Sequence, residues 1–222
     1  MGLNNKIKLN PIDAFINEVD HALRVTYAKA PTTGRSNPSQ GIENSVTGVE
    51  LSASEKKHSA SLMRVNHSGE VAAQGLYRGQ ALMSKSDQVR EQMKVSADEE
   101  NDHLNWCENR LEELDSHKSF LSPVWYIGSF GIGAIAGLAG DKWSLGFVKE
   151  TEDQVGKHIA SHLKKLPEND ILSKAILEQM QIDEAQHAEA AVDAGAVTLP
   201  MPIRKGLMPL ISKVMTTVSA KI

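Results

Sequence analysis

The sequence contains a single cysteine, Cys107, among its 222 residues. One cysteine cannot form a disulfide within the chain, which excludes a disulfide-stabilised fold and favours a reducing compartment. The same scarcity excludes the thiolate clusters that bind zinc or iron–sulfur centres. We expect Cys107 to be a small buried hydrophobic residue rather than a nucleophile.

The sequence also lacks an excess of positive charge. It has 24 Lys and Arg against 28 Asp and Glu, which gives a formal net charge of -4 at pH 7. Such a chain has no basic field to attract nucleic acid, so we expect no nucleic-acid partner. The stretch from Met1 to Lys8 lacks the apolar core of a signal peptide, and Lys6 stands where a myristoylation motif needs Ser or Thr. We therefore expect neither secretion nor an N-terminal lipid.

No apolar run is long enough to span a bilayer as a helix, which takes about 20 apolar residues. The nearest candidate, residues 123–140, has eighteen residues without a charge and contains five glycines before Asp141 interrupts it. Near its ends are four aromatic residues: Trp125, Tyr126, Trp143 and Phe147. Aromatic residues at the ends of an apolar segment are typical of a membrane interface, so we predict that residues 122–142 face a membrane. Packing on a bundle or in a dimer is the alternative.

What the sequence does contain is a repeated acidic pattern. Two Glu-x-x-His steps occur, at 100–103 and 184–187, and a lone glutamate precedes them by 30 and 32 residues, respectively. On a helix, positions i and i+3 share a face, so each step offers a carboxylate and an imidazole to one point in space. The spacing corresponds to about one helix, a turn and a second helix. The six residues concerned are Glu70, Glu100, His103, Glu152, Glu184 and His187.

Two helices with a lone glutamate and two with Glu-x-x-His form the ligand set of carboxylate-bridged di-iron or di-manganese bundles. Each of the four glutamates falls on an apolar stripe of its helix, where an unpaired carboxylate is costly. Four converging carboxylates would also repel one another unless cations were bound. Oxygen and nitrogen ligands suit iron or manganese. The sequence therefore predicts an all-α four-helix bundle with a two-metal site in its core.

Acidic residues also stand four positions before each histidine, Glu99 before His103 and Asp183 before His187. A carboxylate that accepts the second ring N–H of a ligating histidine fixes the tautomer and orientation of the ring. Glu99 and Asp183 are candidates for this role, although a facing helix can supply the partner equally well.

Helical periodicity predicts the bundle helices at about 52–83, 86–115, 145–166 and 176–191, with Ser52 or Ser54 as the first N-cap. Before them, a run from Pro11 to Pro31 predicts a helix that packs by its apolar side. Residues 31–51 are rich in Gly, Pro, Ser and Asn and are expected to form a surface linker without a function. We thus divide the chain into an N-terminal helix and linker (1–51), a bundle (52–195) and a tail (196–222).

The tail carries one more amphipathic pattern. Apolar residues recur at helical spacing from Leu207 to Val218, and basic residues lie among and around them. This pattern predicts an amphipathic helix, and together with the segment at 122–142 it favours contact with a membrane surface.

Four other residues have less specific signals. Tyr77 is expected to pack in the core with a hydrogen-bonded hydroxyl, with redox or substrate contact as the alternative. His158 is explained as well by packing as by contact with substrate or a redox partner. His158 and His162 have a zinc-compatible spacing but lack the central glutamate of a metalloprotease helix. His67 is expected to be structural or an outer partner of the site.

The segments at 64–70 (RVNHSGE) and 76–80 (LYRGQ) resemble the demethoxyubiquinone hydroxylase family, the flavin-free di-iron monooxygenases of ubiquinone biosynthesis. The resemblance covers about residues 52–222 and is to a bacterial-type member. It implies a ferritin-like fold and two iron ions per chain. It also implies the roles of the ligands: Glu70 and His103 for one iron, Glu152 and His187 for the other, and Glu100 and Glu184 bridging both.

The resemblance further implies O₂-dependent hydroxylation of a demethoxy prenyl-benzoquinol, of the 2-polyprenyl-3-methyl-6-methoxy-1,4-benzoquinol type, late in ubiquinone biosynthesis. The resemblance also implies peripheral attachment to the cytoplasmic face of the cell membrane. It is compatible with a homo-oligomer or with contacts to other quinone-pathway proteins. The alternative is a ferritin-like iron-storage or iron-detoxifying protein, which explains the six ligands but not the apolar segment and tail. A structural bundle with coincidental motifs is disfavoured by the inward-facing glutamates.

Overall fold

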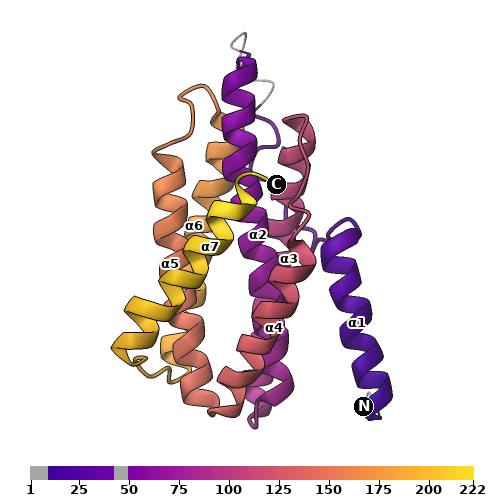
Figure 1. The fold of residues 1–222 in the computed structure, drawn as a ribbon, viewed down its shortest axis with the longest axis vertical. Coiled ribbons are helices and arrows are strands. Elements are labelled where there is room, and N and C mark those ends of the chain that lie inside the picture. The colour runs from indigo at the N-terminus through magenta and orange to yellow at the C-terminus, as the bar shows by residue number, and fades with distance from the viewer. Residues whose placement is uncertain (1–9, 43–49) are drawn as a thin grey trace.

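A computed structural model describes residues 10–42 and 50–222. Regular structure within these residues is entirely helical: α1 (Pro11–Tyr27), α2 (Ala53–Met83), α3 (Asp87–Glu113), α4 (Ser122–Leu138), α5 (Asp141–Leu163), α6 (Ile171–Asp193), the π-helical turn η1 (Ile203–Leu207) and α7 (Met208–Ser219). The expected all-α, ferritin-like bundle is confirmed, with α2, α3, α5 and α6 as its long helices (Figure 1). Residues 1–9 and 43–49 lie outside the described part, and with them the expectations about the N-terminal stretch and part of the linker.

Serine residues start both helices of the first repeat. Ser52 accepts a hydrogen bond from the backbone N–H of Glu55, and the Glu55 side chain accepts one from the backbone N–H of Ser52. Ser86 caps α3 by accepting from the N–H of Val89. These bonds satisfy backbone donors that a helix N-terminus otherwise leaves without partners. Of the two predicted N-cap candidates, Ser52 and Ser54, the structure uses Ser52.

Two apolar layers form the core between the helix pairs α2–α3 and α5–α6. Met63, Trp106 and Met180 belong to one layer, and Tyr77 and Met93 belong to the other. Burial of each large side chain contributes roughly 1.5–3 kcal/mol, so these layers supply the stability of the bundle. In the sequence of every bundle helix the predicted ligands fall between the two layers.

The uncharged segment forms α4, which packs along α2. Glycines permit the close approach: a Cβ at Gly79 would overlap the backbone oxygen of Phe130, and one at Gly133 would overlap that of Leu76. The exposed apolar residues of α4 are Val124, Ile127, Ile135 and Leu138. None of the described helices is both long and apolar enough to cross a membrane.

The prediction that α1 packs on the bundle by its apolar side holds only near the C-terminal end of the helix, where Val25 is buried and Ala22 packs beside it against Tyr126 of α4. Phe15 is 69% exposed and Ile16 is 57% exposed. Polar contacts with α2 also hold the helix, since Arg78 donates two hydrogen bonds to Glu18 and His21 Nε2 lies 3.2 Å from Gln74 Oε1. The apolar residues nearer the N-terminus of α1, such as Phe15 and Val19, line an open groove between α1 and α4 and stay largely exposed.

The first part of the segment after α1, residues 30–33, contacts α3. Both carboxylate oxygens of the buried Asp102 accept hydrogen bonds from this segment, donated by Thr32 and Thr33. The backbone N–H of Ala30 donates to Glu108 at 3.1 Å. The segment is therefore attached to the bundle, which differs from the uninvolved linker expected from its composition.

The tail forms η1 and α7, the expected amphipathic helix, and α7 runs across the outside of the bundle against α2 (Figure 1). Met208 is buried, whereas Leu207, Leu210 and Val214 are exposed. The tail thus covers the bundle with one side and leaves an apolar side uncovered.

Candidate metal centre

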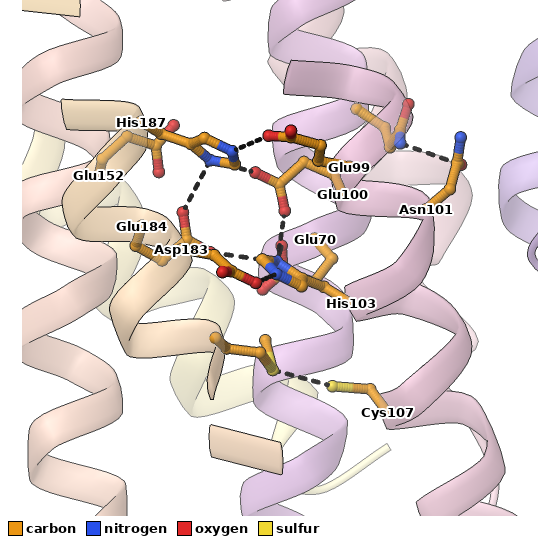
Figure 2. A network of polar contacts seen from close by, with 12 residues as sticks. Glu70, Glu99, Glu100, Asn101, His103, Cys107, Glu152, Asp183, Glu184 and His187 are labelled. Atoms are coloured by element: carbon orange, nitrogen blue, oxygen red, sulfur yellow. Dashed lines mark hydrogen bonds and ion pairs between the residues drawn. The ribbon is translucent and has the colours of Figure 1, made fainter. Parts of the chain in front are cut away.

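The six sequence-predicted ligands converge in the middle of the bundle (Figure 2). They come from all four long helices: Glu70 from α2, Glu100 and His103 from α3, Glu152 from α5, and Glu184 and His187 from α6. All six side chains are buried, and the most exposed is His187 at 7%. The structure therefore brings together, away from water, every residue that the sequence proposes as a ligand.

The donor atoms form two groups with two shared members. Atoms of Glu70, Glu100, His103 and Glu184 lie within 4.8 Å of one another, and so do atoms of Glu100, Glu152, Glu184 and His187. Each group has three carboxylates and one imidazole, a donor set suited to iron or manganese. Glu100 and Glu184 occur in both groups, which is the position that bridging carboxylates require.

Several of these atoms have no polar neighbour among the described residues outside the cluster itself: Glu100 Oε1, both carboxylate oxygens of Glu184, and His187 Nδ1. A buried polar atom without a partner typically costs about 1–3 kcal/mol. Donor atoms that converge on a common space and have only one another as neighbours are what a bound cation would satisfy. The residues thus fit a pair of metal ions.

Burial and neighbouring charges set the protonation of the cluster before a metal binds. Burial, followed by the charge of Glu100, raises the pKa of Glu70 well above its usual value, and burial followed by Glu184 does the same to Glu152. Burial also opposes ionisation of Glu100, but the two histidines outweigh it and hold its pKa well below the usual value. Burial would lower the pKa of His187, but Glu100 and Glu184 raise it to about 12. Metal binding must therefore release protons.

The imidazole of His103 turns Nδ1 toward the cluster and Nε2 away from it. Nδ1 lies 2.8 Å from Glu100 Oε2 and 3.4 Å from Glu184 Oε1. Nε2 lies 2.9 Å from Asp183 Oδ2 on the facing helix α6. With Nε2–H donating to this carboxylate, Nδ1 carries the lone pair that a metal would take.

His187 repeats this arrangement from the other side, with Nδ1 3.1 Å from Glu100 Oε1 and Nε2 2.6 Å from Glu99 Oε2. Glu99 and Asp183 thus contact the ligand histidines, but each contacts the histidine of the facing helix rather than that of its own motif. The reason is that each Nε2 points across the gap between α3 and α6 (Figure 2).

Asp183 has a partner that the sequence reasoning missed. Arg35, in the segment after α1, places Nη2 2.7 Å from Asp183 Oδ2. Burial would raise the pKa of Asp183, but the hydrogen bonds from His103 and Arg35 outweigh burial and lower it. A lone arginine in an irregular segment has no periodic pattern, so the sequence contains no signal that pairs it with α6.

Tyr77 is fully buried, and its hydroxyl donates a hydrogen bond to Glu152. The expected core position with a hydrogen-bonded hydroxyl is confirmed. Its partner is one of the four clustered carboxylates, so Tyr77 connects α2 to the α5 member of the second donor group.

The remaining sequence candidates lie apart from the two donor groups. His158 packs against His162 with ring centroids 4.4 Å apart. His162 Nδ1 lies 3.2 Å from Asn66 Oδ1, and burial lowers the pKa of His162 to about 3. Burial lowers the pKa of His67 to about 4 and raises that of Cys107 well above its usual value. The buried, hydrophobic environment expected for Cys107 is confirmed, with Met180 Sδ 3.7 Å from its Sγ.

A cavity of about 130 Å³ adjoins the cluster. Three of the clustered carboxylates line it: Glu70, Glu152 and Glu184. The rest of its lining is mostly apolar and comes from α2, α4, α5 and α7, including Leu76, Ile132, Phe147, Val155, Ile211 and Met215. An apolar molecule in this cavity would meet the carboxylates directly.

The chain is similar to proteins of ubiquinone biosynthesis. The family model for the ubiquinone biosynthesis protein COQ7 matches residues 57–219. A 3-demethoxyubiquinol 3-hydroxylase of Polynucleobacter necessarius is 55% identical over 218 residues, which cover 96% of this chain and 100% of the relative. The same-named protein of Acinetobacter baylyi is 54% identical over 208 residues, covering 94% of this chain and 96% of the relative. The same-named protein of Nitrosococcus oceani is 53% identical over 209 residues, covering 94% of this chain and 95% of the relative.

Proposed function

The chain belongs to the COQ7 family of ubiquinone biosynthesis proteins and is a hydroxylase of that pathway, and we propose that it works with two iron ions held by the buried cluster. Its proposed substrate is a demethoxy prenyl-benzoquinol of the 2-polyprenyl-3-methyl-6-methoxy-1,4-benzoquinol type, with O₂ as the oxidant. The observation that carries this proposal is the pair of donor groups that share Glu100 and Glu184.

The roles of the ligands follow from membership of the two groups. Glu70 and His103 belong to one group only, Glu152 and His187 to the other, and Glu100 and Glu184 to both. In the proposal the first four residues each serve one iron and the last two bridge. When bound there, two ferrous ions would supply the electrons and the charge stabilisation that O₂ activation needs. The protein holds the ligands in place and keeps water away from them.

The cavity beside Glu70, Glu152 and Glu184 is the proposed site of the quinol ring. Its apolar lining would exclude water and receive an aromatic ring, while the carboxylate side places the ring next to the metal ligands. Because residues of α4 and α7 form part of the lining, a prenyl tail would leave the cavity between these two helices.

The same two helices carry exposed apolar side chains, among them Ile127 and Ile135 on α4 and Leu210 and Val214 on α7. Such surfaces are typical of proteins that lie on a membrane. We therefore place the enzyme peripherally, at the cytoplasmic face of the cell membrane, where a prenylated substrate would enter without crossing water. The exposed apolar residues of α1, such as Phe15 and Ile16, extend the surface that is available for this contact.

The test uses full-length protein loaded anaerobically with ferrous iron in detergent, then exposed to ¹⁸O₂ with a demethoxy prenyl-benzoquinol. We expect about two irons per chain and a hydroxylated product that carries one ¹⁸O atom. Glu184→Ala protein that remains folded should give no product, because both donor groups lose a member. Two irons without any hydroxylated product would overturn the reaction, and uptake of many irons per chain as mineral would favour the iron-storage alternative.

A further inference from the structure

The N-terminal segment reaches the candidate metal centre through the guanidinium of Arg35. Nη2 of Arg35 lies 2.7 Å from Asp183 Oδ2, and the same oxygen lies 2.9 Å from His103 Nε2. Gln179 donates to the other carboxylate oxygen at 2.9 Å. Both oxygens of Asp183 are therefore engaged, and the orientation of the carboxylate is set from three sides.

Arg35 is also held by an aromatic ring. Its guanidinium carbon lies 5.0 Å from the centroid of the Trp106 ring, within the range of a cation–π interaction. Trp106 is 1% exposed, and its ring centroid lies 5.4 Å from that of His103. A planar guanidinium can stack on a ring while it donates hydrogen bonds in its own plane, which an ammonium group cannot do.

The backbone that carries Arg35 is attached to the bundle immediately before this residue. Thr32 and Thr33 donate to Asp102, which is adjacent to His103 in sequence. Gly34 then takes a φ of 97°, a conformation that L side chains rarely adopt, and the chain turns toward α6. The segment therefore contacts α3 on both sides of His103 in sequence, at Asp102 through its threonines and at Trp106 through the guanidinium.

We propose that Arg35 is a positioning residue for the iron that His103 would bind. It holds Asp183 in the orientation that accepts the Nε2–H of His103, which keeps Nδ1 directed at the cluster. Asp183 is only 8% exposed in its side chain, so without Arg35 its charge would lack a counter-charge and the carboxylate would turn toward water. This inference rests on the proposed function, because it concerns one of the two proposed irons.

The size of the expected effect follows from how directly a residue contacts the metal ligand. Removal of a group that orients a ligating histidine typically lowers metal affinity by about 10–100-fold. Arg35 acts through Asp183, so we expect its loss to accelerate release of one iron by roughly 10-fold, at the lower end of that range. The iron at His187 should be unaffected, because the partner of His187 is Glu99.

The experiment loads full-length protein with ⁵⁷Fe(II) alone and follows release to a ferrous chelator together with the Mössbauer spectrum. In Arg35→Gln protein, one of the two irons should leave about 10-fold faster and one of two signals should change. Arg35→Lys keeps the charge but lacks the planar guanidinium, so its rate of iron release should lie between those of the unaltered protein and of Arg35→Gln. The matched control is Arg24→Gln, which removes an exposed arginine paired with Asp20 on α1 and should match the unaltered protein.

A double variant tests whether the two residues act through one contact. Arg35→Gln combined with Asp183→Asn should release iron no faster than Asp183→Asn alone, since coupled residues are not additive. The inference is overturned if Arg35→Gln releases iron as Arg24→Gln does. If the glutamine variant does not fold, the same comparison is made with Arg35→Lys. Equal acceleration of both irons, or multiplication of the two effects in the double variant, would overturn it as well. Unaltered protein that binds no iron would overturn the proposed function and this inference with it.

Discussion

Nε2 of His187 lies 2.6 Å from Glu99, the residue that precedes the glutamate of the other Glu-x-x-His motif. The reciprocal pair, His103 and Asp183, has the same form. Each motif therefore supplies both ligands for the cluster and the carboxylate that orients the imidazole of the other motif. The two halves of the site depend on each other, and a shift of α3 along α6 by one residue would disrupt both pairs.

Membership of the donor groups predicts how many irons each substitution removes. Glu100→Ala deletes a donor that both groups share and should reduce iron from about two per chain to nearly none. Glu70→Ala deletes a donor of one group and should leave about one iron. Iron analysis on folded protein checks this, with circular dichroism to confirm helix content. Equal losses in the two variants would contradict the assignment of Glu100 as a bridging residue.

The close contact of α4 with α2 predicts a glycine-specific effect on stability. Gly133→Ala places a Cβ on the backbone oxygen of Leu76, so the helices must separate, and we expect a destabilisation of about 2–4 kcal/mol. Gly131 lies on the same helix with nothing near its Cβ position. Gly131→Ala should be neutral or stabilising by up to about 1 kcal/mol, since alanine favours the helix. Thermal unfolding of both proteins checks the difference, and similar midpoints would show that α4 does not pack in this way.

The six clustered residues were predictable because helix geometry converts sequence spacing into position. Glu100 and His103 share a face on any helix, and an unpaired acid on an apolar stripe already indicates a buried site. The exposure of the apolar residues of α1 and the contact of Arg35 were not predictable. Periodicity shows which side of a helix is apolar but not whether another element covers it, and Arg35 reaches Asp183 only through the tertiary path of the segment that carries it.

His162 predicts a specific dependence of stability on pH. Burial, followed by the charges of His158 and Lys165, lowers its pKa to about 3 in the folded protein, against about 6.5 in an unfolded chain. Above pH 6.5 both states are neutral at this residue. As the pH falls below 6.5, this histidine takes up a proton in the unfolded chain but stays neutral in the folded protein. The free energy of unfolding therefore decreases until the pH nears 3.

Comparison with a His162→Gln variant isolates this contribution. Between pH 6.5 and 4.5 the unaltered protein should lose roughly 2–3 kcal/mol more than the variant does, because all other titrating groups are common to both. Urea unfolding at a series of pH values measures the difference. A difference that stays constant with pH would show that His162 takes up its proton in the folded state.

The exposed apolar surfaces of α4 and α7 predict binding to lipid. Leu210→Asp and Ile127→Asp should each weaken binding to vesicles of phosphatidylcholine and anionic phosphatidylglycerol by roughly 10-fold or more, because each places a charge in the apolar contact. Val95, an exposed apolar residue on α3, provides the matched control. Val95→Asp should bind as the unaltered protein does, and an equal loss in all three variants would rule out a membrane surface formed by α4 and α7.

Tyr77 predicts a link between a core hydroxyl and one half of the metal site. Tyr77→Phe removes the hydrogen bond to the buried Glu152 and leaves a carboxylate oxygen without it, which should destabilise the protein by about 1–3 kcal/mol. Iron bound by Glu152 and His187 should be released roughly 10-fold faster, while the iron at His103 is retained.

Tyr126 is a matched control, since its hydroxyl is also buried but makes no hydrogen bond to the described residues. Tyr126→Phe should therefore preserve both stability and iron. If Tyr77→Phe behaves in the same way as Tyr126→Phe, Glu152 keeps its position by packing alone, and Tyr77 is a core residue without influence on the metal site.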